Sequence, residues 1–427
     1  MLLPEDPALD AADQAPAGRK GVLQGMGWAG LDQAVSSCTN FGITVVAARE
    51  LSRTGFGTFG LAFSISIVVM GFLRALVTEP LLSRPEAAAG ERRRPAFAAV
   101  TGASLVFGGV AAAGVAIAGL FLEPDIGRAL LTLAVLLPGV CVQDAWRYCF
   151  ISQGRPLAAV VNDSVWLLAQ VAALAVLAAT GRWSPSSILL AWGGAGAGGT
   201  LLGLYQAKVL PRPQAAWSWL RDQRDLAGRY SLEFVTSNGA TQLVLVGLGA
   251  ISGLAALGAV RGAQTFFGPI SVLFSSVVLA VVPAATRLRA APARLRRLAG
   301  AVSAGVCAIA VAWTIAGVAL PGSAGRELFG ASWDSTRRVL LPMGLIFIAN
   351  GVAGGPYAGL RSLAAAREGL YVRLLSLPLV IAGSLAGAAV AGATGFTYGL
   401  AGATIVTAPI YWWQFTRAST RFVESRP

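Results

Sequence analysis

The sequence predicts an all-α integral membrane protein with about twelve transmembrane helices in two pseudo-symmetric six-helix lobes. Three observations predict this fold. Of the 427 residues, 55% are hydrophobic and only 12% are charged, which is too apolar for a soluble chain of this length. Apolar runs long enough to cross a bilayer as helices recur along the chain. Polar positions of the first half also return in the second half.

The apolar runs define the predicted spans, which short segments rich in Gly, Pro and Arg separate. The first six are predicted at 24–47, 56–82, 97–121, 127–150, 157–180 and 186–208, and the second six at 230–250, 255–284, 298–320, 338–359, 370–392 and 396–416. The corresponding domains are a disordered tail at 1–20, an N-terminal lobe at 21–208, a linker at 209–229, a C-terminal lobe at 230–416 and a tail at 417–427.

Basic residues indicate how the spans are oriented. Most of the 33 Lys and Arg residues fall in alternate segments between spans, including both tails and the linker. Because cytoplasmic loops of membrane proteins collect Lys and Arg, we expect both termini to be cytoplasmic. The linker places Trp217 and Trp219 beside Arg residues, which predicts an amphipathic segment lying on the headgroups.

An internal repeat relates the two lobes. An offset of 201 residues pairs Leu31-Asp32 with Leu232-Glu233, Ser36 with Ser237, Asn40 with Thr241 and Gly57 with Gly258. Since an even number of spans separates the copies, both begin on the same side of the membrane, and the symmetry axis runs along the membrane normal. We expect Asp32 and Glu233 to face each other across the cytoplasmic entrance between the lobes.

Polar and charged residues inside the spans mark candidate functional positions. Asp32, Ser36, Asn40 and Thr44 recur every fourth residue, so a helix stacks them along one face. Arg74 lies within the apolar run VVMGFLRALV, where facing lipid would cost at least ~2.5 kcal/mol. It must therefore face protein or water.

Two interpretations of these charges remain open. Asp32 and Arg74 form a buried ion pair between neighbouring spans, line a polar cavity between the lobes, or do both. Asp144, Arg147 and Asp163 lie near the inner ends of spans four and five. For these, pairing such as Asp144 with Arg147 at i,i+3 is the structural alternative to a role in gating.

The composition also excludes several classes of chemistry. The chain contains no histidine, so neither an imidazole metal ligand nor a Ser-His dyad is available. The loop at 325–338 is too short to build the external site of a membrane-embedded glycosyl-transferring enzyme. We therefore expect no catalytic residues, no metal site and no cofactor.

Four stretches together resemble the bacterial polysaccharide flippases of the multidrug/oligosaccharidyl-lipid/polysaccharide exporter (MOP) superfamily. They are LDQAVSSCTNFGITVVAAREL, FGTFGLAF, RALVTEPLL and QDAWRYCFISQGRP. The resemblance covers roughly the first 170 residues. It implies two lobes around a central cavity, and transport by rocking between inward-open and outward-open states.

The resemblance implies a flippase that moves an undecaprenyl-diphosphate-linked oligosaccharide from the inner to the outer leaflet for cell-surface polysaccharide biosynthesis. A diphosphate needs cations in the cavity, and Arg offers forked donors to phosphate oxygens. The candidate substrate-binding residues are Arg74, Arg261, Asn40, Ser36, Thr44, Asn238, Thr241 and Gln242. The candidate gating or coupling residues are Asp32, Glu233, Asp144, Arg147 and Asp163.

A cation-coupled multidrug extruder of the same superfamily is the alternative, with Asp32 as the residue that binds the coupling ion. The expected partners are membrane lipids and a lipid-linked glycan, with a polysaccharide polymerase or glycosyltransferases as candidate protein partners, and no nucleic acid is expected. The expected location is the bacterial cytoplasmic membrane.

Overall fold

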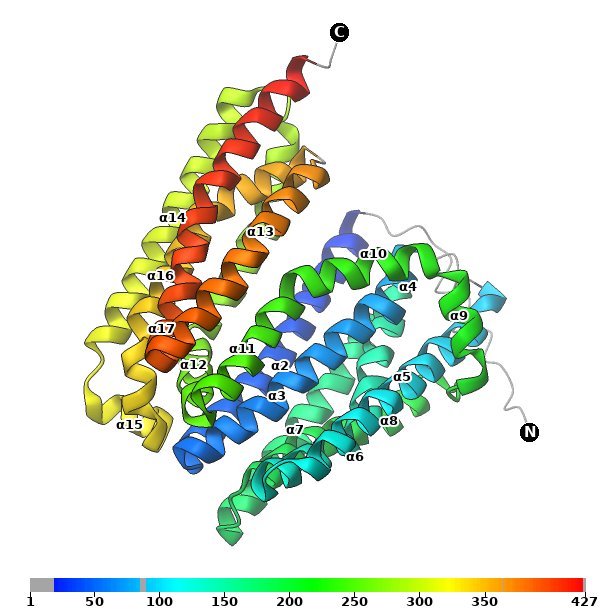
Figure 1. The fold of residues 1–427 in the computed structure, drawn as a ribbon. Helices are drawn as coiled ribbons and strands as arrows, with labels where there is room; N and C mark the ends of the chain where they lie inside the picture. The colour runs from blue at the N-terminus through cyan, green and yellow to red at the C-terminus, as the bar shows by residue number, and fades with distance from the viewer. Residues whose placement is uncertain (1–18, 85–89, 364, 425–427) are drawn as a thin grey trace.

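The computed structural model describes residues 19–84, 90–363 and 365–424, and among the side chains it leaves out are those of Asp32, Ser237 and Asn238. In these ranges all regular structure is helical, as predicted. The helices form two bundles that meet near α15 and diverge toward the end where the C-terminus lies (Figure 1). The predicted disordered tail at 1–20 falls almost wholly outside the described residues.

The first bundle contains α2 (Arg19–Glu50), α3 (Arg53–Leu73), α5 (Arg93–Phe121), α6 (Pro124–Ser152), α7 (Pro156–Thr180) and α8 (Pro185–Ala207). Helix α3 continues through a π-helical segment, η1 (Arg74–Thr78), into α4 (Glu79–Ser83), and a short 3₁₀ turn, η3 (Gly90–Arg92), precedes α5. Capping residues and prolines determine where these helices begin. Ser184 caps α8 through a reciprocal hydrogen-bonded box with Ser187, and Pro185 follows it at the first helical position.

The second bundle contains α12 (Leu254–Phe266), α13 (Gly268–Arg287), α14 (Pro292–Ala319), α15 (Gly322–Phe329), η6 (Gly330–Ser332), α16 (Trp333–Ser362) and α17 (Ala366–Glu424). Helix α17 is two helices joined at a sharp kink, where Ala391 and Gly392 leave helical geometry. Gly392 has φ of 58°, a conformation that glycine adopts without a steric penalty. This kink separates predicted spans eleven and twelve.

Eight helical segments in the described ranges are long and apolar enough to cross a membrane. They contain predicted spans two to six and nine to twelve, because one segment, Arg367–Phe422, holds two spans. Predicted span eight is not one continuous helix, since it divides at Phe267 into α12 and α13. The cause is Pro269 in the first turn of α13, which has no N–H to continue the hydrogen-bond ladder.

Predicted span seven is also composite. It begins in α10 (Arg224–Phe234), continues through a second π-helical segment, η5 (Val235–Gly239), and ends in α11 (Ala240–Ser252). Segment η5 lies against α3, and α10 lies against η1. The two π-helical segments are therefore found where the second span of one lobe meets the first span of the other.

The crossing of α3 and α12 joins the two bundles and supports the predicted repeat. The offset of 201 residues carries Arg53, where α3 begins, onto Leu254, where α12 begins. A Cβ added to Gly258 would lie 3.2 Å from the backbone nitrogen of Gly57, its repeat partner. Repeat-related positions that touch each other must lie close to the symmetry axis, so the axis passes through this crossing.

A cluster of contacts joins the first bundle to the second bundle at the end where they meet, and we call this cluster the apex. Arg53 Nε donates to the carbonyl oxygen of Ala331 at 2.9 Å, and its Nη2 lies 3.7 Å from Asp334 Oδ2. A side chain on Gly57 would collide with the carbonyl of Leu254. The apex therefore depends on close backbone approach between α3 and α12.

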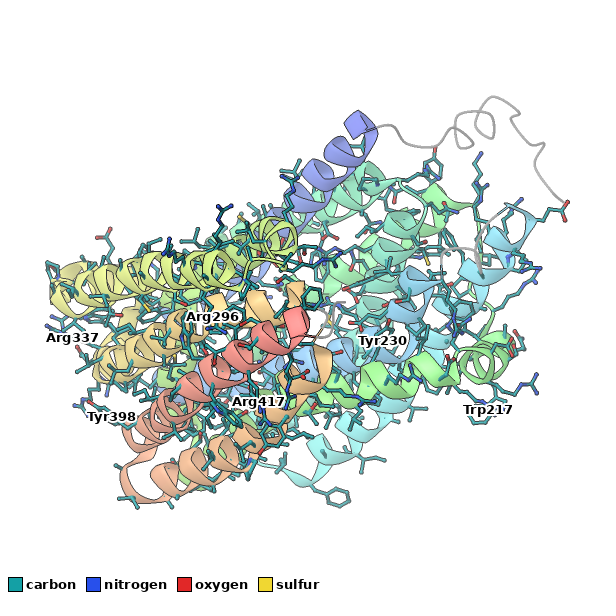
Figure 2. The ribbon with its side chains drawn as sticks, turned by 90° about the horizontal axis from the view of Figure 1, so that it is seen from above. Trp217, Tyr230, Arg296, Arg337, Tyr398 and Arg417 are labelled. Carbon is teal, nitrogen blue, oxygen red and sulfur yellow. The ribbon has the colours of Figure 1, made fainter. Side chains whose placement is uncertain are left out.

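The linker and the C-terminal segment differ in part from their predicted structures. The linker contains η4 (Pro213–Ala215), α9 (Ala216–Asp222) and the start of α10. Trp217 is 71% exposed and projects from the molecule (Figure 2), as an interfacial anchor requires. The same prediction is wrong for Trp219, which is buried and donates from Nε1 to the carbonyl of Val77 at 3.2 Å. The segment predicted as a tail at 417–427 remains helical to Glu424.

Candidate functional site

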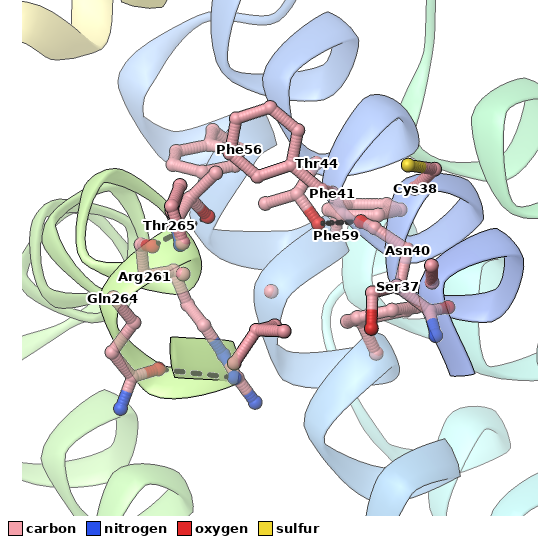
Figure 3. Close-up of a pocket in the computed structure, with 16 residues that line it drawn as sticks. Ser37, Cys38, Asn40, Phe41, Thr44, Phe56, Phe59, Arg261, Gln264 and Thr265 are labelled. Carbon is pink, nitrogen blue, oxygen red and sulfur yellow. Dashed lines mark hydrogen bonds between the residues drawn. The ribbon is translucent and has the colours of Figure 1, made fainter. Parts of the chain in front are cut away.

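A cavity of about 610 Å³ lies between the two bundles. Helices α2 and α3 form one wall, and α12 and α13 form the other (Figure 3). Its polar lining comes from Ser37, Asn40, Thr44, Arg261, Gln264 and Thr265. We call this space the central cavity.

Arg261 is the one charged residue in the described lining of the central cavity. Its side chain is buried, with 7% of the residue exposed. It donates from Nη1 to Gln264 Oε1 at 3.1 Å and from Nη2 to Gln242 Oε1 at 2.8 Å, and Nη2 also contacts Ser64 Oγ. Each of these acceptors is neutral.

Among the described residues, no negative charge neutralises the charge of Arg261. Within the described part of the chain, no carboxylate forms an ion pair with Arg261, and its Nε–H has no hydrogen-bond acceptor. A buried cation without a counter-ion is costly. An anion entering the cavity would supply the missing charge.

Aromatic rings form the other conspicuous part of the cavity wall. Phe56, Phe59 and Phe63 recur at helical spacing on α3 and stack in sequence, with ring centroids 6.5 and 5.4 Å apart. These rings, together with Gln264 and Thr265, were not among the site residues predicted from the sequence. The signal was present in the spacing, because Gln264 follows Arg261 by three residues and Phe56, Phe59 and Phe63 share one helical face.

A second, smaller polar cavity of about 230 Å³ lies inside the N-terminal lobe. It contains five of the predicted site residues in addition to Asn40, which also lines the central cavity: Ser36, Arg74, Asp144, Arg147 and Asp163. We call it the N-lobe pocket. The fold therefore brings most of the predicted charged residues together. They lie inside the N-terminal lobe, whereas the expected cavity was between the lobes.

Ion pairs between helices hold the charges of the N-lobe pocket. Arg74 forms a fork with Asp144, Nε to Oδ2 and Nη2 to Oδ1, both at 2.7 Å. Arg147 Nε lies 3.6 Å from Asp163 Oδ2. The expected i,i+3 pair of Asp144 with Arg147 is therefore wrong, since each residue pairs with another helix. The physical reason is that a buried carboxylate is stabilised more by a bidentate arginine than by a neighbour one turn away.

This pairing changes the interpretation of Arg74. It was predicted to offer a free guanidinium to substrate, but Asp144, which is nearly buried, occupies both prongs of the fork. The side chain of Arg74 keeps 31% of its surface exposed. Of the two open interpretations, a buried ion pair describes Arg74, with Asp144 as the partner.

Other predicted site residues occupy varied places. Thr44 lines the central cavity, but its hydroxyl donates to the carbonyl of Asn40 at 2.7 Å, so only its oxygen lone pairs remain for a ligand. Gln242 reaches the cavity through Arg261. Thr241 is half-buried on α11. The side chains of Asp32 and Asn238 lie outside the described residues.

Glu233 belongs to a cluster in the C-terminal lobe. Its Oε1 accepts from Arg373 Nη1 at 3.0 Å, and its side chain is 58% exposed. The predicted approach of Glu233 to Asp32 stays untested, because the side chain of Asp32 is not described. An acid at the first span of the C-terminal lobe is thus held by a basic residue of the same lobe.

The chain has the fold of the MOP-superfamily transporters. No family model and no curated protein sequence matches it. An inward-facing multidrug resistance MATE family transporter of the MOP superfamily matches with a TM-score of 0.70 and 13% identity, over 93% of this chain and 100% of that one. The lipid II flippase MurJ, in an inward closed conformation, matches with a TM-score of 0.65 and 9% identity, over 92% and 90%.

The arrangement of the bundles is more similar to an inward-facing than to an outward-facing transporter. An outward-facing MATE family transporter matches with a TM-score of 0.58 and 12% identity, over 94% of this chain and 96% of that one. The diverging ends of the bundles carry the C-terminus and α10 (Figure 1). These are the ends at which the basic residues predict the cytoplasm.

Proposed function

We propose that the chain is a flippase of the MOP superfamily, located in the bacterial cytoplasmic membrane, that moves an undecaprenyl-diphosphate-linked oligosaccharide from the inner to the outer leaflet. The observation that carries the proposal is Arg261, a buried arginine without a carboxylate partner among the described residues, in the cavity between the lobes. Alternating access would expose this cavity to each side in turn.

The chemistry of the substrate suits this cavity. A diphosphate cannot cross hydrocarbon without neutralisation, and Arg261 places a cation in the cavity wall. Asn40 and Gln264 provide hydrogen-bonding groups for sugar hydroxyls. The phenylalanine rings of α3 supply flat apolar faces for the less polar faces of sugar rings. None of these groups is specific for one sugar.

A cation-coupled multidrug extruder is the second candidate, and two observations favour it. The rings of Phe56, Phe59 and Phe63 suit flat apolar drugs, and the N-lobe pocket contains two carboxylates, Asp144 and Asp163. However, Arg74 and Arg147 already pair with these carboxylates. Arg261 would also repel a cationic drug in the central cavity.

Reconstituted flipping separates the two candidates. Purified protein in liposomes would be tested with a fluorescent polyprenyl-diphosphate disaccharide, and protection of the probe from a membrane-impermeant quencher would report its transfer. We expect Arg261→Gln to slow flipping by more than tenfold, because it removes a charged hydrogen-bond donor worth about 1.5–3 kcal/mol. Arg261→Lys should retain part of the rate, since it keeps the charge but loses the fork.

The matched control is Arg337→Gln, which removes an exposed arginine at the end of the C-terminal lobe far from Arg417 (Figure 2). It should flip at the wild-type rate. Unchanged flipping in Arg261→Gln would refute the role of Arg261, and a wild type that does not flip the probe would refute the flippase. Uptake of a cationic dye driven by a proton or sodium gradient, without flipping of the lipid, would establish the extruder instead.

A further inference from the structure

A cavity of about 500 Å³ lies inside the C-terminal lobe, apart from the central cavity. Residues of α13, α14, α16 and the second half of α17 line it. Phe274, Val302 and Val306 contribute apolar walls, whereas Tyr357, Arg361 and Tyr411 contribute aromatic and charged groups. We call it the C-lobe cavity. It combines an apolar interior with one basic corner.

Two arginines share one tyrosine ring at the basic corner. The guanidinium carbon of Arg361 lies 5.7 Å from the ring centroid of Tyr357, and that of Arg373 lies 5.8 Å from it. The hydroxyl of Tyr357 accepts from Arg373 Nη2 at 3.0 Å. Such cation–π contacts hold the positive charges in place beside the cavity.

The corner carries more positive than negative charge. Arg373 pairs with Glu233, which is largely exposed. Arg361 is exposed in the last turn of α16, and no carboxylate in the described part of the chain lies within 4.0 Å of it. The guanidinium groups of Arg361 and Arg373 therefore have one carboxylate, that of Glu233, beside them. The excess positive charge favours binding of an anion at this corner.

The C-lobe cavity and the central cavity share a helix. Gly268, Pro269 and Val272 of α13 line the central cavity, and Phe274 of the same helix lines the C-lobe cavity. Arg361 lies in the last turn of α16, and Arg373 lies near the start of α17. Both of these helix ends are on the side where the bundles diverge (Figure 1). A ligand at the basic corner would thus lie at the open side and be separated from Arg261 by α13.

We propose that the C-lobe cavity is a second anion-binding site, which takes the phosphate head of an amphipathic lipid anion before that head reaches Arg261. Naming this anion a polyprenyl diphosphate rests on the proposed function. Arg361 and Arg373 bind the diphosphate oxygens, and the walls around Val302 and Val306 accept the first isoprenoid units. Two successive sites of moderate strength suit transport, because each must release what it binds.

Calorimetric titration of the purified protein in nanodiscs of zwitterionic lipid tests this site with farnesyl diphosphate as the probe. We expect two classes of site in the wild type. Arg361→Gln should weaken one class about tenfold, as expected for a lost charged hydrogen bond, and Arg261→Gln should weaken the other. Arg337→Gln, which alters the opposite end of the same helix α16, is the control and should leave both classes intact.

Competition identifies the source of the anion. Farnesol and inorganic diphosphate should each compete poorly, because one lacks the charge and the other lacks the apolar chain. Nanodiscs that contain phosphatidylglycerol should leave the affinity of the second class unchanged if the site prefers a diphosphate. Loss of this class in phosphatidylglycerol would instead assign the site to a membrane lipid headgroup and overturn the substrate assignment.

Flipping assays separate failure of this inference from failure of the proposed function. Arg361→Gln should raise the substrate concentration at half-maximal rate about tenfold and leave the maximal rate within about twofold, since it acts before Arg261. Tyr357→Leu, which removes the shared ring, should do the same. If both variants bind and flip as the wild type while Arg261→Gln does not, the second site is refuted and the flippase stands. If Arg361→Gln loses a binding class although the wild type does not flip the probe at all, the flippase is refuted and the second site stands.

Discussion

Gly60 and Arg261 are equivalent positions of the two halves, and they touch. The offset of 201 residues relates them, and a Cβ on Gly60 would lie 3.1 Å from Arg261 Cγ. The smallest residue of one half therefore makes room for the largest cation of the other at the symmetry axis. Symmetry is broken at the position of the one charged residue in the described lining of the central cavity.

Gly60→Ala should impair transport because it displaces the side chain of Arg261. The added methyl group would press on the Arg261 side chain, and an off-rotamer side chain costs about 0.5–1.5 kcal/mol. We expect flipping to slow about two- to tenfold, with little change in the thermal unfolding midpoint. Gly109→Ala on α5, where a Cβ would meet nothing within 4 Å, is the control. A Gly60→Ala protein that flips at the wild-type rate would show that Arg261 tolerates displacement.

Cys38 reports the charge of the central cavity. It is exposed and lines the cavity with Arg261, whereas Cys141 and Cys149 are buried. An anionic thiosulfonate should modify Cys38 roughly twofold faster than a cationic one of equal size at low salt, because the guanidinium attracts it. Labelling would be measured in a Cys307→Ala background, because Cys307 is half-buried; Arg261→Gln should remove the difference, and Cys38→Ala should remove the labelling. Faster labelling by the cation would contradict the anion-binding interpretation of the cavity.

Removing one partner of the pair Arg74–Asp144 should destabilise the N-terminal lobe. Breaking a fully buried pair costs about 3–5 kcal/mol. Because Arg74 is 31% exposed, solvent screening lowers our expectation to about 1–3 kcal/mol. Arg74→Met with Asp144→Asn should recover most of that loss, as measured by the free energy of unfolding in detergent. The exposed pair Asp125 with Arg128 is the control, and its loss should change stability by less than about 0.5 kcal/mol.

Acid should weaken the contact between α4 and α10. Hydrogen bonds from Arg84 hold the pKa of Asp225 below its ordinary value of 3.8. A lowered pKa means that the stabilisation is fully present above that value and is lost as the pH falls below it. Wild type should therefore unfold at a higher temperature than Asp225→Asn at pH 6, and the gap should close below about pH 3.8. An equal gap at both pH values would exclude titration of Asp225.

A side chain at Gly57 should open the apex. Gly57→Leu would collide with the backbone of Leu254, so α3 and α12 must separate. A disulfide crosslink between cysteines introduced at Arg53 and Ala331, which are joined by a hydrogen bond in this state, should then form in lower yield. Gly109→Leu should not affect the yield. An unchanged yield in Gly57→Leu would mean that the apex does not depend on this close approach.

The apolar runs were sufficient to predict most of the membrane-spanning helices, since burial in lipid leaves few alternatives for such a run, but they did not predict the breaks within spans seven and eight. The repeat offset paired Gly57 with Gly258 and Gly60 with Arg261 as equivalent positions, and the structure brings both pairs into contact. Pairing of charges was not predictable in the same way. Asp144 lies three residues from Arg147 in the sequence but pairs with Arg74, which is 70 residues away. Which of two cations a carboxylate selects depends on the rotation and depth of packed helices, and the sequence pattern of one helix carries no such information.

The segments η1 and η5 give two helices at the junction of the lobes a property that a regular α-helix lacks. A π-helical turn contains one more residue than an α-helical turn. The position of this extra residue can shift along the helix, which changes the direction of the helix axis while most backbone hydrogen bonds remain. Segments η1 and η5 are neighbours through α10 and α3, and the ring of Phe234, at the end of α10, leaves no room for a side chain on Gly71 of α3. The close contact between Phe234 and Gly71 therefore has a π-helical segment, which can bend, on each of its two helices. In the proposed alternating access, this contact would stay closed while the helices around it bend, without exposing unpaired backbone to the hydrocarbon.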